Sequence, residues 1–90
     1  MLCVVKKPGE DPEMKEIENT LEALQHEVDG YIECVMLCRN IICIVNEEGR
    51  LRGMEPNTLG LVGPVVFVGD AGDEFRGLTE DEAFYLMHRV

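Results

Sequence analysis

The sequence predicts an α+β domain, an antiparallel sheet of about four to five strands with two helices in the order β-β-α-β-β-β-α. Short runs of apolar and β-branched residues, such as residues 41–45, are typical of strands. Two separate helix-capping motifs are typical of helix starts. The chain has 90 residues, so we expect residues 1–90 to form a single domain with one core.

The first third of the chain predicts a strand, a second strand and a helix. Residues 2–5 are continuously apolar and predict a buried strand, which the turn-rich residues 7–12 end. Residues 14–18 alternate between apolar and charged and predict a half-exposed strand. Asn-Thr-Leu-Glu at residues 19–22 fits a capping box, and Asp29-Gly30 ends the helix that follows.

The remaining chain predicts three main strands, one short partner segment and a helix. Residues 31–38 and 41–45 form a hairpin around a two-residue turn, and residues 51–53 are a short partner strand. The last strand covers residues 62–68. Thr-Glu-Asp-Glu at residues 79–82 is a second capping box before an apolar helical stripe. We expect both helices to cover one face of the sheet.

Acidic residues strongly outnumber basic ones, and the chain carries a net charge of −10. Such an excess repels phosphate backbones and anionic lipid headgroups, so we expect no direct binding to nucleic acid and none to a membrane. The first residues carry their lysines after the apolar run, which is the reverse of a secretory signal. No apolar run approaches the roughly 20 residues that span a bilayer. A cytoplasmic location is therefore expected.

The four cysteines, Cys3, Cys34, Cys38 and Cys43, all stand inside apolar runs and are expected to be buried free thiols. We expect Cys34 and Cys38 on the same face of one strand, which is unlike the loop-borne ligand pairs of structural zinc sites. No neighbouring base activates a thiol, and the chain contains no serine. We therefore expect no catalytic residue, no metal site and no cofactor.

The stretch IVNEEGRLRGMEPN at residues 44–57 combines adjacent glutamates, two arginines and a Pro-Asn pair. Its residues 46–49 match a type I turn, with asparagine first and glycine fourth. Carboxylates at a solvated tip lack the opposed environments that acid–base catalysis needs. A structural turn is the preferred interpretation, and contact with a ligand or partner is the alternative.

The charges are unevenly distributed. Residues 8–38 carry nine acids and one base, residues 70–82 carry six acids and one base, and Arg39, Arg50 and Arg52 gather near the central hairpin. This pattern has three interpretations: solvation alone, an acidic face for a basic protein, or a basic corner for a small anion.

Several motifs in order give the chain a resemblance to the family called domain of unknown function 3846, from about residue 14 onward. They are Gly30-Tyr31-Ile32-Glu33, Asn46-Glu47-Glu48-Gly49-Arg50-Leu51, Gly53, Pro56, Asn57, Gly63-Pro64-Val65-Val66-Phe67-Val68-Gly69 and Leu78-Thr79-Glu80-Asp81-Glu82. The resemblance implies a small protein of bacterial phages, plasmids or related mobile elements, and it brings no enzymatic activity with it.

The expected function is a non-catalytic accessory protein that acts by binding in the bacterial host cell and counters a host defence. Its partner is either a host protein on the acidic face or a small anionic ligand held by an oligomer. The candidate binding residues are Arg50, Arg52, Asn57, Asn46 and Glu48. A structural or regulatory interaction module is the alternative, and an enzyme is not supported. The small core and apolar sheet faces favour a homodimer.

Overall fold

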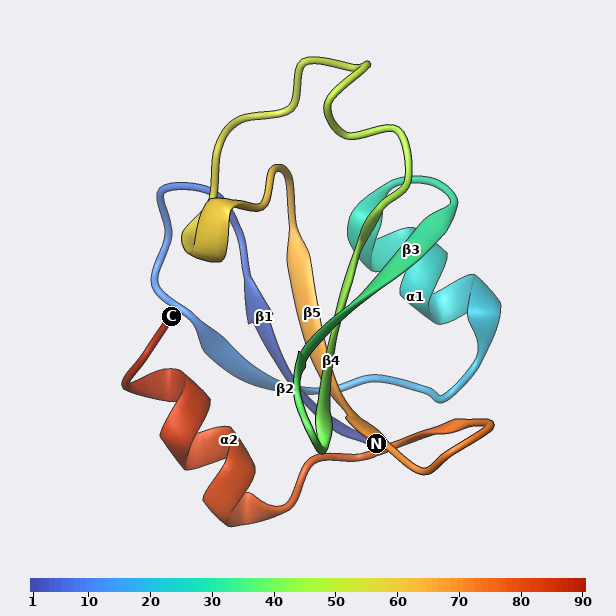
Figure 1. Cartoon of the computed structure of the whole chain (residues 1–90), viewed down its shortest axis with the longest axis vertical. Coiled ribbons are helices and arrows are strands. Elements are labelled where there is room, and N and C mark those ends of the chain that lie inside the picture. Colours follow the sequence, from blue (N-terminus) through green and yellow to red (C-terminus); the bar gives the residue numbers. More distant parts are fainter.

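The computed structural model describes all of residues 1–90, and its elements are shown in Figure 1. They are β1 (Leu2–Lys6), β2 (Glu13–Glu16), α1 (Leu21–Val28), β3 (Ile32–Cys38), β4 (Ile41–Asn46), the 3₁₀ turn η1 (Thr58–Gly60), β5 (Val65–Asp70), β6 (Phe75–Arg76) and α2 (Glu80–Met87). The predicted α+β class and the order of elements are confirmed, with the two-residue β6 as an additional strand. No helix is both long and apolar enough to cross a membrane.

All strand pairs are antiparallel, and the sheet has the order β2-β1-β5-β4-β3, with β6 added beside β5. The middle strand β5 has β1 on one side and β4 on the other, so Phe67 lies opposite both Val4 and Cys43. Residues 65–69 of β5 are all buried. An uninterrupted apolar run is typical of a strand covered on both faces.

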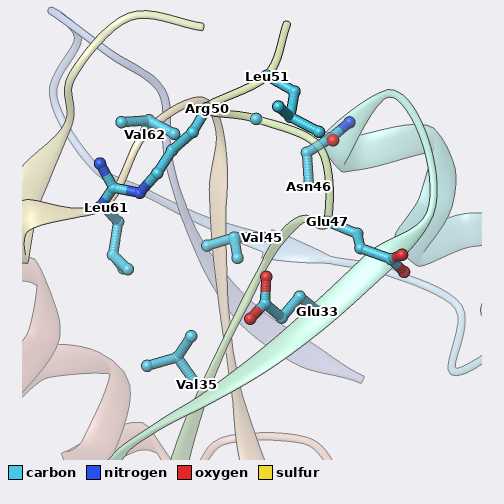
Figure 2. A pocket seen from close by; sticks show the side chains of 10 residues that line it. Glu33, Val35, Val45, Asn46, Glu47, Arg50, Leu51, Leu61 and Val62 are labelled. Carbon is cyan, nitrogen blue, oxygen red and sulfur yellow. The ribbon is translucent and has the colours of Figure 1, made fainter. Parts of the chain in front are cut away.

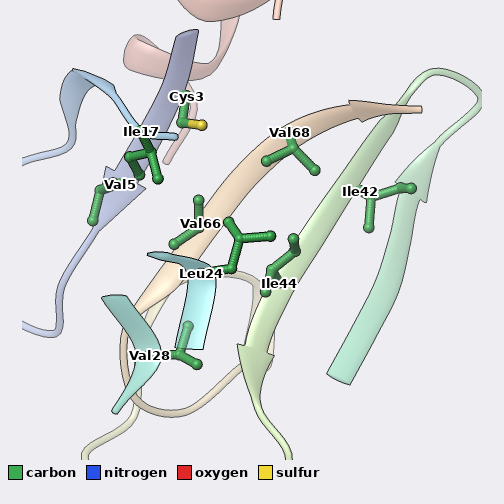
Figure 3. Close-up of a cluster of buried hydrophobic side chains, with 9 residues drawn as sticks. All are labelled: Cys3, Val5, Ile17, Leu24, Val28, Ile42, Ile44, Val66 and Val68. Carbon is green, nitrogen blue, oxygen red and sulfur yellow. The ribbon is translucent and has the colours of Figure 1, made fainter. Parts of the chain in front are cut away.

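The two helices cover opposite faces of the sheet, so the expectation that both lie on one face is wrong. Successive side chains of a strand point to opposite faces. Val66 and Val68 of β5 therefore join Leu24 of α1 in one core, which Figure 3 shows. Val65 and Phe67 join Leu86 of α2 in the other. Because β4 and β5 are apolar at nearly every position, each face needs its own cover.

Residues 51–53, predicted as a strand, are part of a long loop that covers residues 47–64. The loop holds η1 and one isolated bridge between Pro56 and Val62. Gly53 has a φ of 68°, in the left-handed region that interrupts a strand. Leu51 is 89% exposed and packs against no other strand. Residues 51–53 therefore do not pair with a neighbouring strand, although their alternating pattern predicts such pairing.

A bulge in β3 changes the expected placement of two cysteines. Met36 lies opposite Ile42, but Cys38 lies opposite Ile41, because the pairing shifts by one residue between them. Cys34 thus lies on the α1 side of the sheet and Cys38 on the α2 side, so the prediction of a shared face is wrong. Both are also exposed, whereas Cys3 and Cys43 are buried as expected.

The helix starts follow the two capping motifs, with one shift. In α2 the predicted capping box is present between Thr79 and Glu82. In α1 the N-cap is Thr20, whose hydroxyl accepts a hydrogen bond from the Ala23 amide at 3.1 Å. Asn19, the predicted cap, instead donates to the Phe75 carbonyl at 3.0 Å. That bond joins the β2–α1 connection to β6.

Candidate functional site

Residues 46–49 form the predicted turn, in which the Gly49 amide donates to the Asn46 carbonyl at 3.2 Å. The Asn46 side chain is buried. Its amide nitrogen donates to the carbonyls of Val28 and Asp29 at 2.9 and 3.1 Å, and its oxygen accepts from the Glu48 amide at 2.7 Å. These bonds use the whole amide group to hold the C-terminal end of α1 against the end of β4.

The side-chain amide of Asn57 is also fully hydrogen-bonded within the chain. Its side-chain nitrogen donates to the carbonyls of Lys6 and Gly63, both at 2.8 Å, and its oxygen accepts from the Thr58 amide at 2.8 Å. The Lys6 ammonium adds a longer bond of 3.3 Å to the same oxygen. Asn57 therefore fastens the loop of residues 47–64 to the end of β1, which explains the side chain without a ligand.

The two arginines of the loop point to different places. Arg52 reaches Asp29, donating to its carbonyl at 2.6 Å and to its carboxylate at 3.0 Å. Arg50 donates only to the Gly60 carbonyl, at 3.1 Å, and has no carboxylate partner. Glu48 lines a separate surface hollow beside Tyr31. The structure thus brings Arg50 and Asn46 to one hollow and leaves the other three candidates outside it.

The hollow beside Arg50 has a volume of about 210 Å³ and lies on the α2 side of β3 and β4, as Figure 2 shows. Its walls are Glu33, Val35, Val45, Asn46, Glu47, Gly49, Arg50, Leu51, Leu61 and Val62. Sequence reasoning did not place Glu33 here, because it belongs to a different strand. Two carboxylates against one guanidinium repel an anion. The volume is also below the roughly 300 Å³ at which small-molecule sites begin.

A second feature, on the α1 side, brings the two acidic segments of the sequence together. The bond from Asn19 to the Phe75 carbonyl joins the β2–α1 connection to β6. A hollow of about 280 Å³ lies at this junction, and it is lined by Asn19, Ile42, Asp70, Gly72, Asp73, Glu74 and Phe75. None of these residues is basic. The sequence predicted the acidity of both segments but not the contact that makes them neighbours.

We name this surface the acidic face. It comprises Asp70, Asp73 and Glu74, which line the hollow, and Glu18 and Glu22, which flank Asn19 in the sequence. Glu18 directly precedes Asn19, and Glu22 lies in the first turn of α1. All but the half-buried Asp70 are exposed. None of the five forms an ion pair within the chain. Their charges are therefore available to a partner.

The largest pKa shifts have identifiable structural causes. Burial raises the pKa of Cys3 and of Cys43 to about 11, which keeps both thiols protonated near neutral pH. The hydrogen bonds from Arg76 lower the pKa of Glu82 to about 2, so this carboxylate stays ionised. No group of three or more His, Cys, Asp or Glu residues is placed to hold a metal ion.

Comparison with known proteins gives one match. A family model described as a domain of unknown function (DUF3846) matches residues 1–90. The similarity extends over the whole chain, including β1 and β2, and not only over the part after residue 14. No curated protein and no solved structure matches the chain.

Proposed function

We propose that this chain, which belongs to the DUF3846 family of domains of unknown function, acts by binding a basic protein through the acidic face and catalyses no reaction. The observation that carries the proposal is the 3.0 Å bond from Asn19 to the Phe75 carbonyl. It holds Asn19, which Glu18 directly precedes in the chain, at the acidic loop that contains Asp73 and Glu74. Two segments about fifty residues apart in sequence thereby become one negative surface.

The chemistry of this surface fits a partner that binds nucleic acid. Such proteins hold phosphates with clustered Lys and Arg side chains. A surface of unpaired carboxylates offers the same basic side chains an alternative set of anions. A net charge of −10 also speeds the encounter with a basic partner at low salt. Competition with phosphate contacts is therefore the mechanism we propose.

The expected biological setting follows from this chemistry and from the family resemblance. A phage or another mobile element gains from a small protein that occupies the nucleic-acid site of a host defence protein. A chain that repels DNA and RNA would occupy that site without binding the nucleic acid itself. We propose this role for the protein in the cytoplasm of a bacterial host.

The small-anion mechanism has weaker support in the geometry of one chain. It relied on Arg50, Arg52 and Asn57 as the lining of a joint pocket. Arg52 is paired with Asp29, and the Asn57 amide is bonded to backbone groups. Only Arg50 has no carboxylate partner, and its hollow contains two glutamates. A purely structural or regulatory module remains the alternative in which the acidic face serves solubility alone.

The test measures retention of basic host proteins on the immobilised chain. The probe is the fraction of a bacterial lysate that binds heparin, and hence contains proteins with phosphate-binding surfaces. We expect retention at low salt that falls steeply as salt rises. The triple variant Glu18→Lys, Asp73→Lys, Glu74→Lys reverses the charge of the acidic face, because only two of its five acids remain and three lysines are added. Its retention should be lost.

A matched control separates the acidic face from net charge. The variant Glu10→Lys, Asp11→Lys, Glu55→Lys makes the same change in charge at exposed residues outside the acidic face. None of these three residues forms an ion pair. This control should retain the probe more strongly than the acidic-face variant. Equal loss in both variants would mean that retention reflects net charge alone, and the proposal would be wrong.

A further inference from the structure

The two edge strands of the sheet differ sharply in how they are protected. Edge strands expose unpaired backbone groups, and proteins usually guard them with charged residues, proline or bulges. At one edge, β2 has the sequence EMKE and follows Pro12. At the other edge, β3 has the sequence IECVMLC, with Glu33 as its one charged residue. The outer side of β3 pairs with no strand of the chain.

The outward-facing backbone groups of β3 can be identified from both of its ends. The Tyr31 carbonyl accepts at 2.8 Å from the amide of Glu47, which directly follows β4, so the backbone groups of Tyr31 face β4. Because backbone direction alternates along a strand, the amides and carbonyls of Ile32, Cys34 and Met36 point outward. The other end agrees. Cys38 pairs with Ile41 across the two-residue turn, and the bulge between Met36 and Cys38 leaves the backbone groups of Met36 facing outward.

We propose that β3 pairs with β3 of a second copy of this chain, antiparallel and around a twofold axis at Cys34. The three outward residues are spaced evenly about Cys34, so a twofold axis there places Ile32 opposite Met36 of the second copy. All three positions then exchange backbone hydrogen bonds at once. The bulge after Met36 ends the regular edge on one side, and the start of β3 at Ile32 ends it on the other.

The alternative registers are poorer. A twofold axis at Glu33 or at Val35 leaves only two of the three outward residues opposite one another. The axis at Glu33 also sets the two Glu33 carboxylates directly across from each other, which is unfavourable. With the axis at Cys34, Glu33 lies opposite Val35 of the second copy. Met36, which is 57% exposed, meets Ile32 and loses part of its contact with water.

The charges at the ends of β3 suit a second copy. Arg39 follows β3 and is exposed, and Asp29 precedes it with a carboxylate that is 78% exposed and is already paired with Arg52 of its own chain. Antiparallel pairing brings Arg39 of each copy to the end of β3 where Asp29 of the other copy lies. Two such contacts form, one on each side of the axis. The homodimer expected from the small core thereby gains a specific interface, which does not use the acidic face.

The first measurement is the dimer dissociation constant, by sedimentation equilibrium under reducing conditions. Met36→Lys places an ammonium opposite Ile32 of the second copy and should raise this dissociation constant by about tenfold or more. Met14→Lys makes the same charge change at the exposed edge strand β2 and should leave the constant unchanged. The repulsion between two copies of net charge −10 outweighs the two Arg39–Asp29 contacts, so screening by salt should strengthen the dimer. Binding of a basic partner to the acidic face has the opposite salt dependence, so the two proposals fail separately.

The second measurement uses the native thiols. In the proposed register the two Cys34 Cα atoms lie about 5.5 Å apart, within the range that a disulfide spans. Copper–phenanthroline with dissolved oxygen should therefore join two chains, the oxygen accepting the two electrons and two protons that the thiols lose. Cys34→Ser should abolish this crosslink, and Cys38→Ser should preserve it. A monomer at all concentrations, or a dimer that Met36→Lys leaves intact and that crosslinks only through Cys38, would overturn the proposal.

Discussion

The carboxylate of Glu82 accepts hydrogen bonds from both terminal nitrogens of the Arg76 guanidinium, at 2.9 and 3.0 Å. Glu82 also accepts from the Thr79 amide at 2.9 Å as part of the capping box. One carboxylate thus joins β6 to the first turn of α2, and α2 contributes Ala83 and Leu86 to the second core. Bidentate contacts of this kind are stronger than single ion pairs.

The ion pair between Arg76 and Glu82 makes the free energy of unfolding depend on pH. The pKa of Glu82 is lowered from 4.5 to about 2, chiefly by the hydrogen bonds from Arg76. The unfolded chain binds the proton more tightly, so the contribution is complete above pH 4.5 and is lost as the pH falls through 2. Glu82→Gln should cost about 1–2 kcal/mol at neutral pH, a value reduced for partial exposure to solvent.

Urea unfolding at several pH values checks this prediction. The difference between the parent and Glu82→Gln should shrink toward pH 2. Glu80→Gln, an exposed change in the same helical turn, should show almost no such difference. A constant difference across the pH range would mean that the amide harms the cap and not the ion pair.

Removal of the Asn46 side chain should destabilise the folded protein, because its hydrogen bonds are structural. Asn46→Ala leaves the Val28 carbonyl and the Glu48 amide without this partner, while the Asp29 carbonyl keeps its bond from Arg52. We expect a loss of about 2–3 kcal/mol in the free energy of unfolding. Asn40→Ala, in the exposed hairpin turn, should cost far less. Chemical denaturation of the purified protein measures both, and similar small costs would contradict the structural role.

Removal of the Asn57 side chain should loosen the loop of residues 47–64. Asn57→Ala breaks the bonds to the carbonyls of Lys6 and Gly63. Trypsin should then cut more rapidly after Arg50 or Arg52, as native-state proteolysis would show. Glu55→Gln, an exposed change in the same loop, should keep the parental rate. A parental rate in Asn57→Ala would show that the loop is held by other contacts.

The thiols should divide into two classes. Cys34 and Cys38 are exposed and should react with Ellman's reagent in the folded protein, at concentrations low enough to keep it monomeric. Cys3 and Cys43 are buried, and their pKa values of about 11 disfavour the thiolate. They should react only after addition of denaturant. Rapid reaction of all four thiols would contradict the packing of both cores.

The strands and helices were predictable because their signals are local. Alternation, apolar runs and capping residues act within a few positions, and they located β3, β4, β5 and α2 correctly. The side of the sheet that each helix covers was not predictable in this way. It depends on which strands become neighbours, and β1 pairs with a strand some sixty residues later.

The candidate site shows the same limit more clearly. Asn57 gave no local reason for its presence, because one of its partners is Lys6 at the other end of the sequence. Arg50 and Arg52 are two residues apart yet point to Gly60 and Asp29. The bulge in β3 leaves no sequence motif, and it moved Cys38 to the other face. The contacts of Asn57 and Arg52 join residues far apart in the sequence, whereas the bulge is a local change of pairing.

The position of β1 between β2 and β5 sets an order on the assembly of the molecule. The β3–β4 hairpin and the β1–β2 hairpin close short loops and can form within microseconds. The contact of β1 with β5 closes a loop of about sixty residues, which is entropically slow. Until that step, the apolar edges of β1 and β4 are both open. We expect this joining of two preformed halves to limit the folding rate, and substitutions in Val66 or Phe67 to slow folding more than substitutions in β3.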